Sequence, residues 1–152
     1  MEIILYEDRY AADFKSLNLE WLDKYHLTEQ RDLDVLNNPR TTIIDEGGII
    51  FLAKEREEIV GSAALMKEHG HEAVYELAKM AVNNKWQGKG IGKLLIEKCL
   101  ATAREWKAVK VTLYSNSQLK SALSMYEKYG FKHAIATDSP FATADVYMEL
   151  VL

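Results

Sequence analysis

The sequence predicts an α/β protein in which helices pack on a mixed β-sheet. Three observations support this prediction. Runs of β-branched residues separated by turn signals fill the middle of the chain. Segments of helical period then alternate with strands in the last third. Neither an internal repeat nor a Pro/Gly/Ser-rich linker interrupts the pattern, so the 152 residues are expected to form one domain, residues 1–152.

The N-terminal part is expected to hold one strand and two helices. Residues 3–6 form a short apolar run, and residues 10–25 have a helical period. That period is carried by Phe14, Leu17, Trp21, Leu22 and Tyr25. A second helix is predicted over 29–36, and Pro39 prevents it from continuing.

The middle of the chain is predicted to be rich in strands. The expected strands are residues 41–44, 49–54, 59–67 and 74–82. Turn signals separate them at Gly47-Gly48, at Arg56-Glu57 and at His69-Gly70-His71. The two histidines are interpreted as an exposed hairpin tip, because further metal ligands are not evident nearby; a metal site is not expected.

The C-terminal part returns to alternation of helices and strands. A helix over 90–106 precedes a strand over 109–114, and a second helix over 119–129 ends at Gly130, a glycine C-cap position. Two final strands, 131–135 and 146–150, are joined by a polar loop that contains Pro140. Cys99 falls within the first of these helices and is interpreted as a buried structural thiol.

The strongest functional signal is the glycine-rich loop Gln87-Gly88-Lys89-Gly90-Ile91-Gly92. It lies between a predicted strand and a predicted helix, whose first turn leaves backbone N–H groups unpaired and electropositive. Such a loop favours a bound phosphate, and Lys85, Lys89 and Lys93 add positive charge. The spacing excludes a Walker loop, because Gln87 stands at the first glycine position. Lys93 likewise breaks the dinucleotide-binding pattern.

Gln87, Gly90 and Gly92 instead match the pattern Gln/Arg-x-x-Gly-x-Gly/Ala. With this loop, the chain resembles the GNAT superfamily of acetyl-CoA-dependent N-acetyltransferases. Three further stretches resemble that family: Glu76-Leu77-Ala78-Lys79-Met80-Ala81-Val82, Leu113-Tyr114-Ser115-Asn116, and Met125-Tyr126-Glu127-Lys128-Tyr129-Gly130-Phe131. The resemblance implies a central, mostly antiparallel sheet of about seven strands flanked by about four helices, with acetyl-CoA as co-substrate.

The resemblance also implies roles for individual residues. Tyr126 would protonate the departing thiolate of CoA, and Glu76 would accept the proton of the attacking amine, directly or through water. Alternatives remain open: Tyr126 packs in the core, or Glu76 only orients substrate. The residues expected to contact the cofactor are Met80, Ala81, Val82, Gln87, Gly88, Lys89, Gly90, Ile91, Gly92, Lys93, Asn116 and Tyr126.

Composition limits the binding partners and the cellular location that can be expected. A net charge of −4 disfavours nucleic acid as a partner and is compatible with an amine acceptor, either a small molecule or a peptide amino group. Five acidic residues near the N-terminus either line the acceptor site or form solvated helix surface: Glu20, Asp23, Glu29, Asp32 and Asp34. The sequence lacks a signal-peptide pattern and a long apolar run, so a cytoplasmic location without membrane contact is expected.

The acetylated amine is not identified by the sequence. A catalytically silent acetyl-CoA-binding regulatory module is the alternative to an enzyme, and it would not need Tyr126 together with Glu76. Dimers are common in the family that the chain resembles, so a homodimer is an alternative to a monomer.

Overall fold

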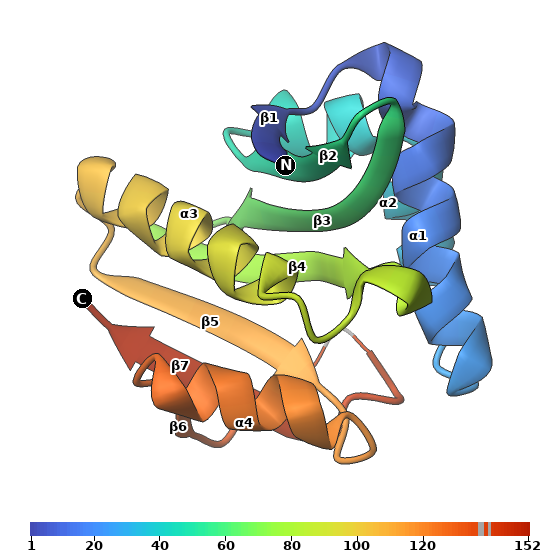
Figure 1. Cartoon of the computed structure of the whole chain (residues 1–152). Helices are drawn as coiled ribbons and strands as arrows, with labels where there is room; N and C mark the ends of the chain where they lie inside the picture. The colour runs from blue at the N-terminus through green and yellow to red at the C-terminus, as the bar shows by residue number, and fades with distance from the viewer. Residues whose placement is uncertain (137–138, 140) are drawn as a thin grey trace.

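A computed structural model describes residues 1–136, 139 and 141–152. Within them, seven strands form one sheet in the order β1-β2-β3-β4-β5-β7-β6 (Figure 1). β4 and β5 pair in parallel, and every other neighbouring pair is antiparallel. The strands are β1 (Glu2–Leu5), β2 (Ile49–Glu55), β3 (Glu58–Lys67), β4 (Val74–Val82), β5 (Lys110–Ser115), β6 (Lys132–His133) and β7 (Val146–Val151).

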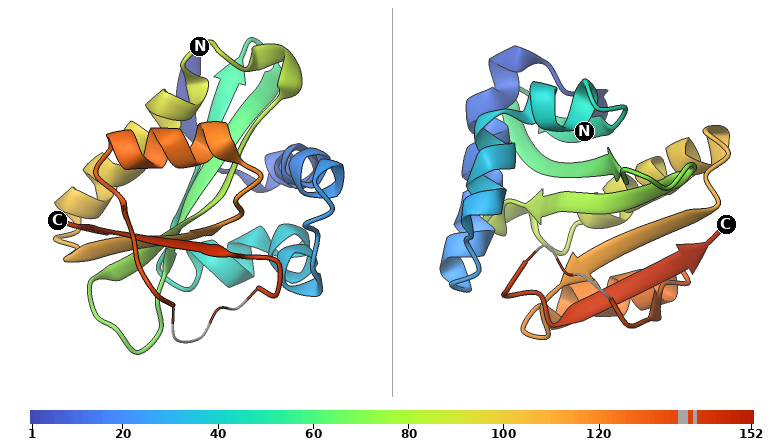
Figure 2. Two further views of the ribbon diagram at one scale, coloured as in Figure 1. Left: turned by 90° about the horizontal axis from the view of Figure 1, so that it is seen from below. Right: turned by 180° about the vertical axis from the view of Figure 1, so that it is seen from behind.

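Helices lie on both faces of this sheet, as the views from below and from behind show (Figure 2). They are α1 (Ala11–Lys24), α2 (Gln30–Asn37), α3 (Ile91–Glu105) and α4 (Lys120–Lys128). Short helical turns are η1 (Asp8–Tyr10), η2 (Arg40–Ile44) and η3 (Asn84–Trp86). The mixed sheet with flanking helices confirms the predicted fold class.

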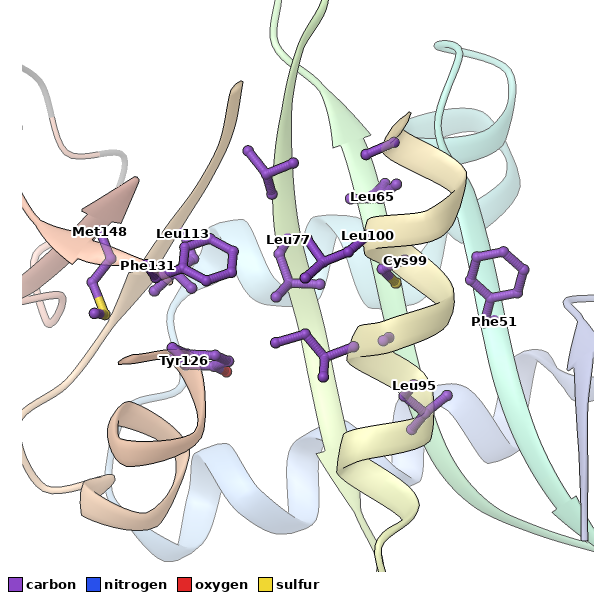
Figure 3. Close-up of a cluster of buried hydrophobic side chains, with 14 of the residues drawn as sticks. Phe51, Leu65, Leu77, Leu95, Cys99, Leu100, Leu113, Tyr126, Phe131 and Met148 are labelled. Atoms are coloured by element: carbon purple, nitrogen blue, oxygen red, sulfur yellow. The ribbon is translucent and has the colours of Figure 1, made fainter. Parts of the chain in front are cut away.

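The alternation of side chains along the strands divides the core into two clusters. In β2, Phe51 and Ala53 pack under α3, whereas Ile50 and Leu52 pack against α1, α2 and η2. The cluster beneath α3 and α4 extends from Phe51 to Met148 and includes Tyr126 (Figure 3). The sheet is therefore held on both sides, and the positions of α3 and α4 relative to β4 and β5 are fixed by buried apolar contacts.

A β-bulge in β4 determines the shape of the sheet at its centre. Ser62 pairs with Ala81 and Ala64 with Ala78, so β4 has one residue more than β3 over this stretch. Lys79 lies in the bulge with φ 51°, a left-handed conformation that is unfavourable for a residue with a Cβ. Bulges bend a strand and increase its twist, and here the bend follows directly after the last pairing of β4 with β5, at Glu76 and Thr112.

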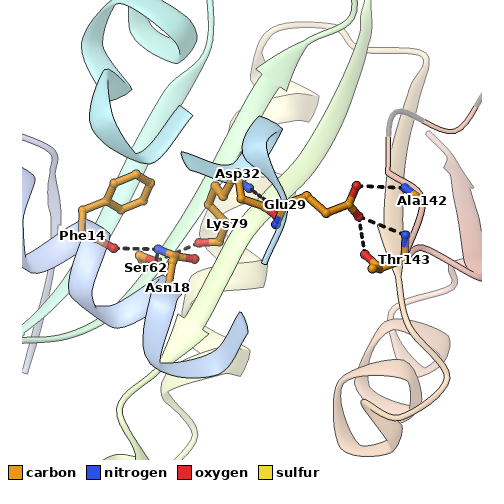
Figure 4. A network of polar contacts seen from close by, with 8 residues as sticks. All are labelled: Phe14, Asn18, Glu29, Asp32, Ser62, Lys79, Ala142 and Thr143. Carbon is orange, nitrogen blue, oxygen red and sulfur yellow. Dashed lines mark hydrogen bonds and ion pairs between the residues drawn. The ribbon is translucent and has the colours of Figure 1, made fainter. Parts of the chain in front are cut away.

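Three buried polar contacts hold the bulge in place (Figure 4). The Lys79 ammonium donates to the Asp32 carboxylate at 2.6 Å, and these two side chains are only 8% and 5% exposed. The Ser62 hydroxyl donates to the carbonyl of Lys79 at 2.8 Å. Asn18 in turn donates to the Ser62 hydroxyl at 3.1 Å, which ties α1 to the same point of β4.

The predicted strand over 41–44 is wrong, because these residues belong to the π-helical turn η2. Asn38 accepts hydrogen bonds from the backbone N–H and the hydroxyl of Thr42, and these bonds favour a helical turn after Pro39. Ile43 is fully buried against the α1 cluster, so tertiary packing overrides its preference for a strand.

The C-terminal strands agree with the prediction in part. The final strand β7 is present, but the strand predicted over 131–135 is reduced to the two residues Lys132–His133. Pro140, placed by the sequence in the loop between them, lies outside the described residues. Among the helices that the structure describes, none has the combination of length and apolar character that crossing a membrane requires.

Replacing Asp32 by Asn should destabilise the protein strongly, because it leaves the Lys79 ammonium buried without its counter-ion. The expected loss is about 3–5 kcal/mol of unfolding free energy. Asp8→Asn, which breaks the exposed pair with Arg40, should cost less than about 1 kcal/mol. Urea denaturation of both variants measures the difference; equal losses would show that the bulge does not depend on the buried pair.

Candidate active site

A cavity of about 740 Å³ opens where β4 and β5 separate. The two strands pair only at Val74, Tyr75 and Glu76 of β4, after which the register ends (Figure 1). Leu77, Ala78, Ala81 and Val82 of β4 still pair with β3, and residues 77–82 line the cavity on the other edge. A strand edge with free backbone groups can pair with an extended ligand as an additional strand would.

The glycine-rich loop forms one end of the cavity. Gly90 is the N-cap of α3 with φ 81°, and Gly88 has φ 75°, so both adopt backbone conformations that favour glycine. Gly90 has no side chain to cap the helix, which leaves the N–H groups of the first turn available to an anion. A Cβ added at Gly92 would lie 3.6 Å from the Met80 methyl and 3.6 Å from the Met125 sulfur.

The predicted loop residues do not all line this cavity. Gln87, Gly88, Gly90, Ile91, Gly92 and Lys93 contribute to its lining. The Lys89 ammonium instead lies over the Trp86 ring, 5.8 Å from its centroid. Gln87 donates to the Val82 carbonyl and to the Asn84 side chain, so it holds the loop to the end of β4.

Tyr126 projects from α4 across the opening towards β4. Its hydroxyl lies 3.9 Å from the Met80 sulfur, and its ring packs edge-on against Phe131. Burial raises the pKa of Tyr126 to about 12, because the ionised phenolate would lack solvation there. The hydroxyl therefore carries its proton throughout the physiological pH range and can act as a donor.

Glu76 lies in the lining of the same cavity, at the point where β4 leaves β5. Among the described residues it forms neither a hydrogen bond nor an ion pair within bonding distance. Burial raises the pKa of Glu76 from 4.5 to about 7, and the positive charges of Lys79 and Arg31 oppose this effect. A carboxyl group with such a pKa can accept a proton near neutral pH and release it again.

Met80, Ala81 and Val82 form the cavity edge of β4 beyond the bulge. The carbonyl of Val82 is already an acceptor, since the Trp21 indole donates to it at 2.7 Å. Trp21 was predicted as an apolar helix residue only; its role in anchoring α1 to β4 depends on the fold and has no local sequence signal. Groups nearer Met80 therefore remain the better candidates for pairing with a ligand.

Asn116 lies in the cavity lining, but both polar atoms of its side chain already form hydrogen bonds within the protein. Its amide donates to the Thr143 carbonyl at 2.7 Å, and its oxygen accepts from the Gln118 backbone at 2.9 Å. Asn116 thus fixes the turn before α4 and the segment before β7. Its direct contact with a cofactor stays a prediction.

The segment Phe141–Thr143 closes the cavity opposite the loop. The Glu29 carboxylate accepts from the backbone N–H groups of Ala142 and Thr143, each at 3.0 Å, and from the Thr143 hydroxyl (Figure 4). Phe141 lies in the cavity lining and was absent from the predicted site residues. Of the five acidic residues near the N-terminus, only Asp32 lines the cavity.

Two other candidates lie away from the cavity. Cys99 is fully buried on the inner face of α3, and burial raises the pKa of its thiol to about 12, which agrees with a structural role. His69, Gly70 and His71 lie in the exposed turn between β3 and β4. Within the described residues, His, Cys, Asp and Glu do not gather in groups of three or more that could hold a metal ion.

Comparison with known proteins places this geometry in a family. Residues 46–133 match the model of the acetyltransferase (GNAT) domain. An uncharacterised N-acetyltransferase of Mycobacterium bovis is 33% identical over 107 residues, which cover 70% of this chain and 63% of the relative's length. The chain therefore belongs to the GNAT acetyltransferase family.

Solved structures agree on the fold. A GNAT-family acetyltransferase of Staphylococcus aureus Mu50 superimposes with a TM-score of 0.88 at 22% identity, covering 97% of this chain and 96% of that one. The PaiA N-acetyltransferase of Thermoplasma acidophilum, solved in complex with coenzyme A, has a TM-score of 0.74 at 17% identity with full coverage of both chains. The observed sheet and helices are thus those of the GNAT fold.

Glu76→Gln should stabilise the protein at high pH and leave its stability unchanged at low pH. The pKa of Glu76 is higher in the folded than in the unfolded chain, so ionisation destabilises the fold as the pH rises from about 4.5 to 7. Because a pKa difference of one corresponds to about 1.4 kcal/mol, the expected gain near pH 8.5 is about 2–3 kcal/mol. Urea denaturation at about pH 4 and pH 8.5 measures it; the same effect at both would contradict the raised pKa.

Proposed function

We propose that the protein is an N-acetyltransferase that moves the acetyl group of acetyl-CoA directly to a primary amine while both are bound. The main support for this proposal is that three functional features border the same cavity. Glu76, Tyr126 and the uncapped N-terminus of α3 all border the opening between β4 and β5. A silent cofactor-binding module has no need for a half-buried acid and a buried phenol at the same opening.

The cavity has the features that acetyl-CoA requires. The pyrophosphate would bind to the N–H groups at Gly90, Ile91 and Gly92, where positive backbone dipoles face the cavity. The space beside the loop is open, because a Cβ added at Gly88 or Gly90 would meet nothing within 4 Å and one at Gly92 would make only ordinary contacts with Met80 and Met125. The extended pantetheine arm would pair with the free edge of β4 around Met80.

The acceptor amine must lose a proton for the transfer to proceed. A free primary amine has a pKa of about 10.4, like that of lysine, so it arrives as an ammonium at neutral pH. Glu76 would accept this proton, either directly or through one water. The pKa of about 7 suits this task, since the carboxylate is ionised in a useful fraction at neutral pH and remains basic enough to take the proton.

The acetyl thioester supplies an activated carbonyl, and the protein has to stabilise the charge that develops on it. A backbone N–H on β4 near Met80 would donate to the carbonyl oxygen. Tyr126, with its pKa raised to about 12, would keep its proton until the thiolate leaves and then donate it. Cys99 does not line the cavity, so it is not positioned as a covalent acetyl carrier.

Tyr126→Phe should lower the turnover number by about a hundredfold or more, because the departing thiolate loses its proton donor. The thermal stabilisation by acetyl-CoA should persist, since the ring remains in place. Tyr10→Phe is the matched control: Tyr10 is as buried as Tyr126, at 8% exposure, but lies outside the cavity lining. Thiol release and melting curves measure both effects; unchanged turnover at every pH would remove Tyr126 from the mechanism.

The rate under subsaturating amine should rise with pH through about pH 7, because only the ionised form of Glu76 accepts the proton. Glu76→Gln should lose this rise and should lower the turnover number by about a hundredfold. Steady-state thiol release across pH measures the profile. A Glu76→Gln profile that keeps the same midpoint would show that another group is the base.

A further inference from the structure

The acceptor half of the cavity is lined mainly by apolar and aromatic side chains. They come from α1, from the residues that follow it and from the segment before β7: Trp21, Leu22, Tyr25, Leu27 and Phe141. Trp21 and Tyr25 stack with ring centroids 5.6 Å apart, which presents a broad aromatic wall. Such a wall favours an apolar or aromatic body, because burial of apolar area is the main gain on binding.

Among the described residues that line this half, one carboxyl group is left to receive a positive charge. Asp32 lies in the lining but is neutralised by Lys79 at 2.6 Å. Glu29 directs both carboxylate oxygens to Ala142 and Thr143. Among the described residues that line the cavity, Glu76 is the carboxyl group without an ion pair or hydrogen bond. A substrate with several ammonium groups would therefore bury the second one without a partner.

Two exposed cations lie against the rings of this half, in addition to Lys79, whose ammonium is 5.5 Å from the Phe141 centroid. The Lys24 ammonium lies over the rings of Trp21 and Tyr25, 5.5 Å from each centroid. The Arg31 guanidinium lies over the Phe141 ring at 5.7 Å. Neither forms an ion pair within the part of the chain that the structure describes. Their charges repel a polycation and leave a substrate with a single ammonium group as the better fit.

We propose that the acceptor is an arylalkylamine: a primary amine on an aromatic body that carries neither a second cation nor a carboxylate beside the amine. This proposal rests on the proposed acetyltransferase function. The amine binds at Glu76, and the aromatic body lies between the Trp21–Tyr25 wall and Phe141. A carboxylate next to the amine would lie beside Glu76, whereas the exposed charges of Lys24 and Arg31 are screened by solvent, so free amino acids are expected to be poorer acceptors.

Phe141 is the specificity-determining residue in this proposal, and its position is fixed by contacts from two directions. Glu29 at the start of α2 binds the backbone of Ala142 and Thr143, and Asn116 binds the Thr143 carbonyl. Glu29 lies more than a hundred residues from these partners in sequence, at separations of 113 and 114. The ring of Phe141 is therefore held over the acceptor half whether or not a substrate is present.

The test compares three amines in the thiol-release assay with the product mass determined: 2-phenylethylamine, spermidine and phenylalanine. The expected kcat/KM for 2-phenylethylamine is at least about tenfold above the other two, a difference of about 1.4 kcal/mol. Phe141→Ala should raise the KM for 2-phenylethylamine about tenfold while the KM for acetyl-CoA stays the same, because only the aromatic wall is lost.

Charge reversal at Lys24 provides a second, independent arm. Lys24→Glu should increase the ratio of kcat/KM for spermidine to that for 2-phenylethylamine several-fold. Arg104→Glu is the matched control, since Arg104 is likewise an exposed basic residue in the last turn of its helix. It lies outside the cavity lining, so the ratio should not move.

The outcomes separate this proposal from the proposed function. Turnover of spermidine or phenylalanine above that of 2-phenylethylamine overturns the arylalkylamine proposal and supports acetyl transfer. Thermal stabilisation by acetyl-CoA without acetylation of 2-phenylethylamine also overturns it and leaves cofactor binding in place. Failure of acetyl-CoA to stabilise the protein contradicts the proposed function itself.

Discussion

The buried ion pair between Lys79 and Asp32 is the interaction on which the site depends. It supports a lysine at φ 51° in the middle of β4, a conformation that costs about 1–3 kcal/mol without compensation. The resulting bulge lies just past the last pair that β4 makes with β5, and the two strands separate from there. Because a bulge bends its strand, the stability of the pair and the shape of the cavity are expected to be coupled.

The same network connects parts of the cavity that are distant in sequence. Asn18 joins α1 to the bulge through Ser62, and Asp32 accepts from the backbone N–H of Glu29 at 2.9 Å. Glu29 then holds the segment that carries Phe141. The proposed cofactor half is built from the loop before α3 and from β4, whereas the proposed acceptor half is held by this chain of polar contacts. A substitution at Asn18, Asp32 or Glu29 is therefore expected to weaken binding of the acceptor more than binding of acetyl-CoA.

Local patterns predicted the elements that depend on local physics. The helix that becomes α3 and the glycines before it follow from period and backbone freedom. Glu76 and Tyr126 were expected from the resemblance to the GNAT family instead, and the cavity lining includes both of them. The left-handed Lys79 and the contact between Glu29 and Thr143 have no local signal, because each is imposed by packing between distant segments. For the same reason Thr41–Ile44, strand-like in composition, is helical where Ile43 must be buried.

In the proposed function, the edge of β4 beyond the bulge binds the arm of acetyl-CoA. Amide hydrogen exchange, measured with and without acetyl-CoA, tests whether this edge binds the cofactor. Slower exchange at Met80 to Val82 and at Gly90 to Gly92, with little change in β1 and β2, is the predicted result. Protection confined to the loop, with exchange in β4 unchanged, would contradict it and would show that the opening between β4 and β5 is not where the cofactor binds.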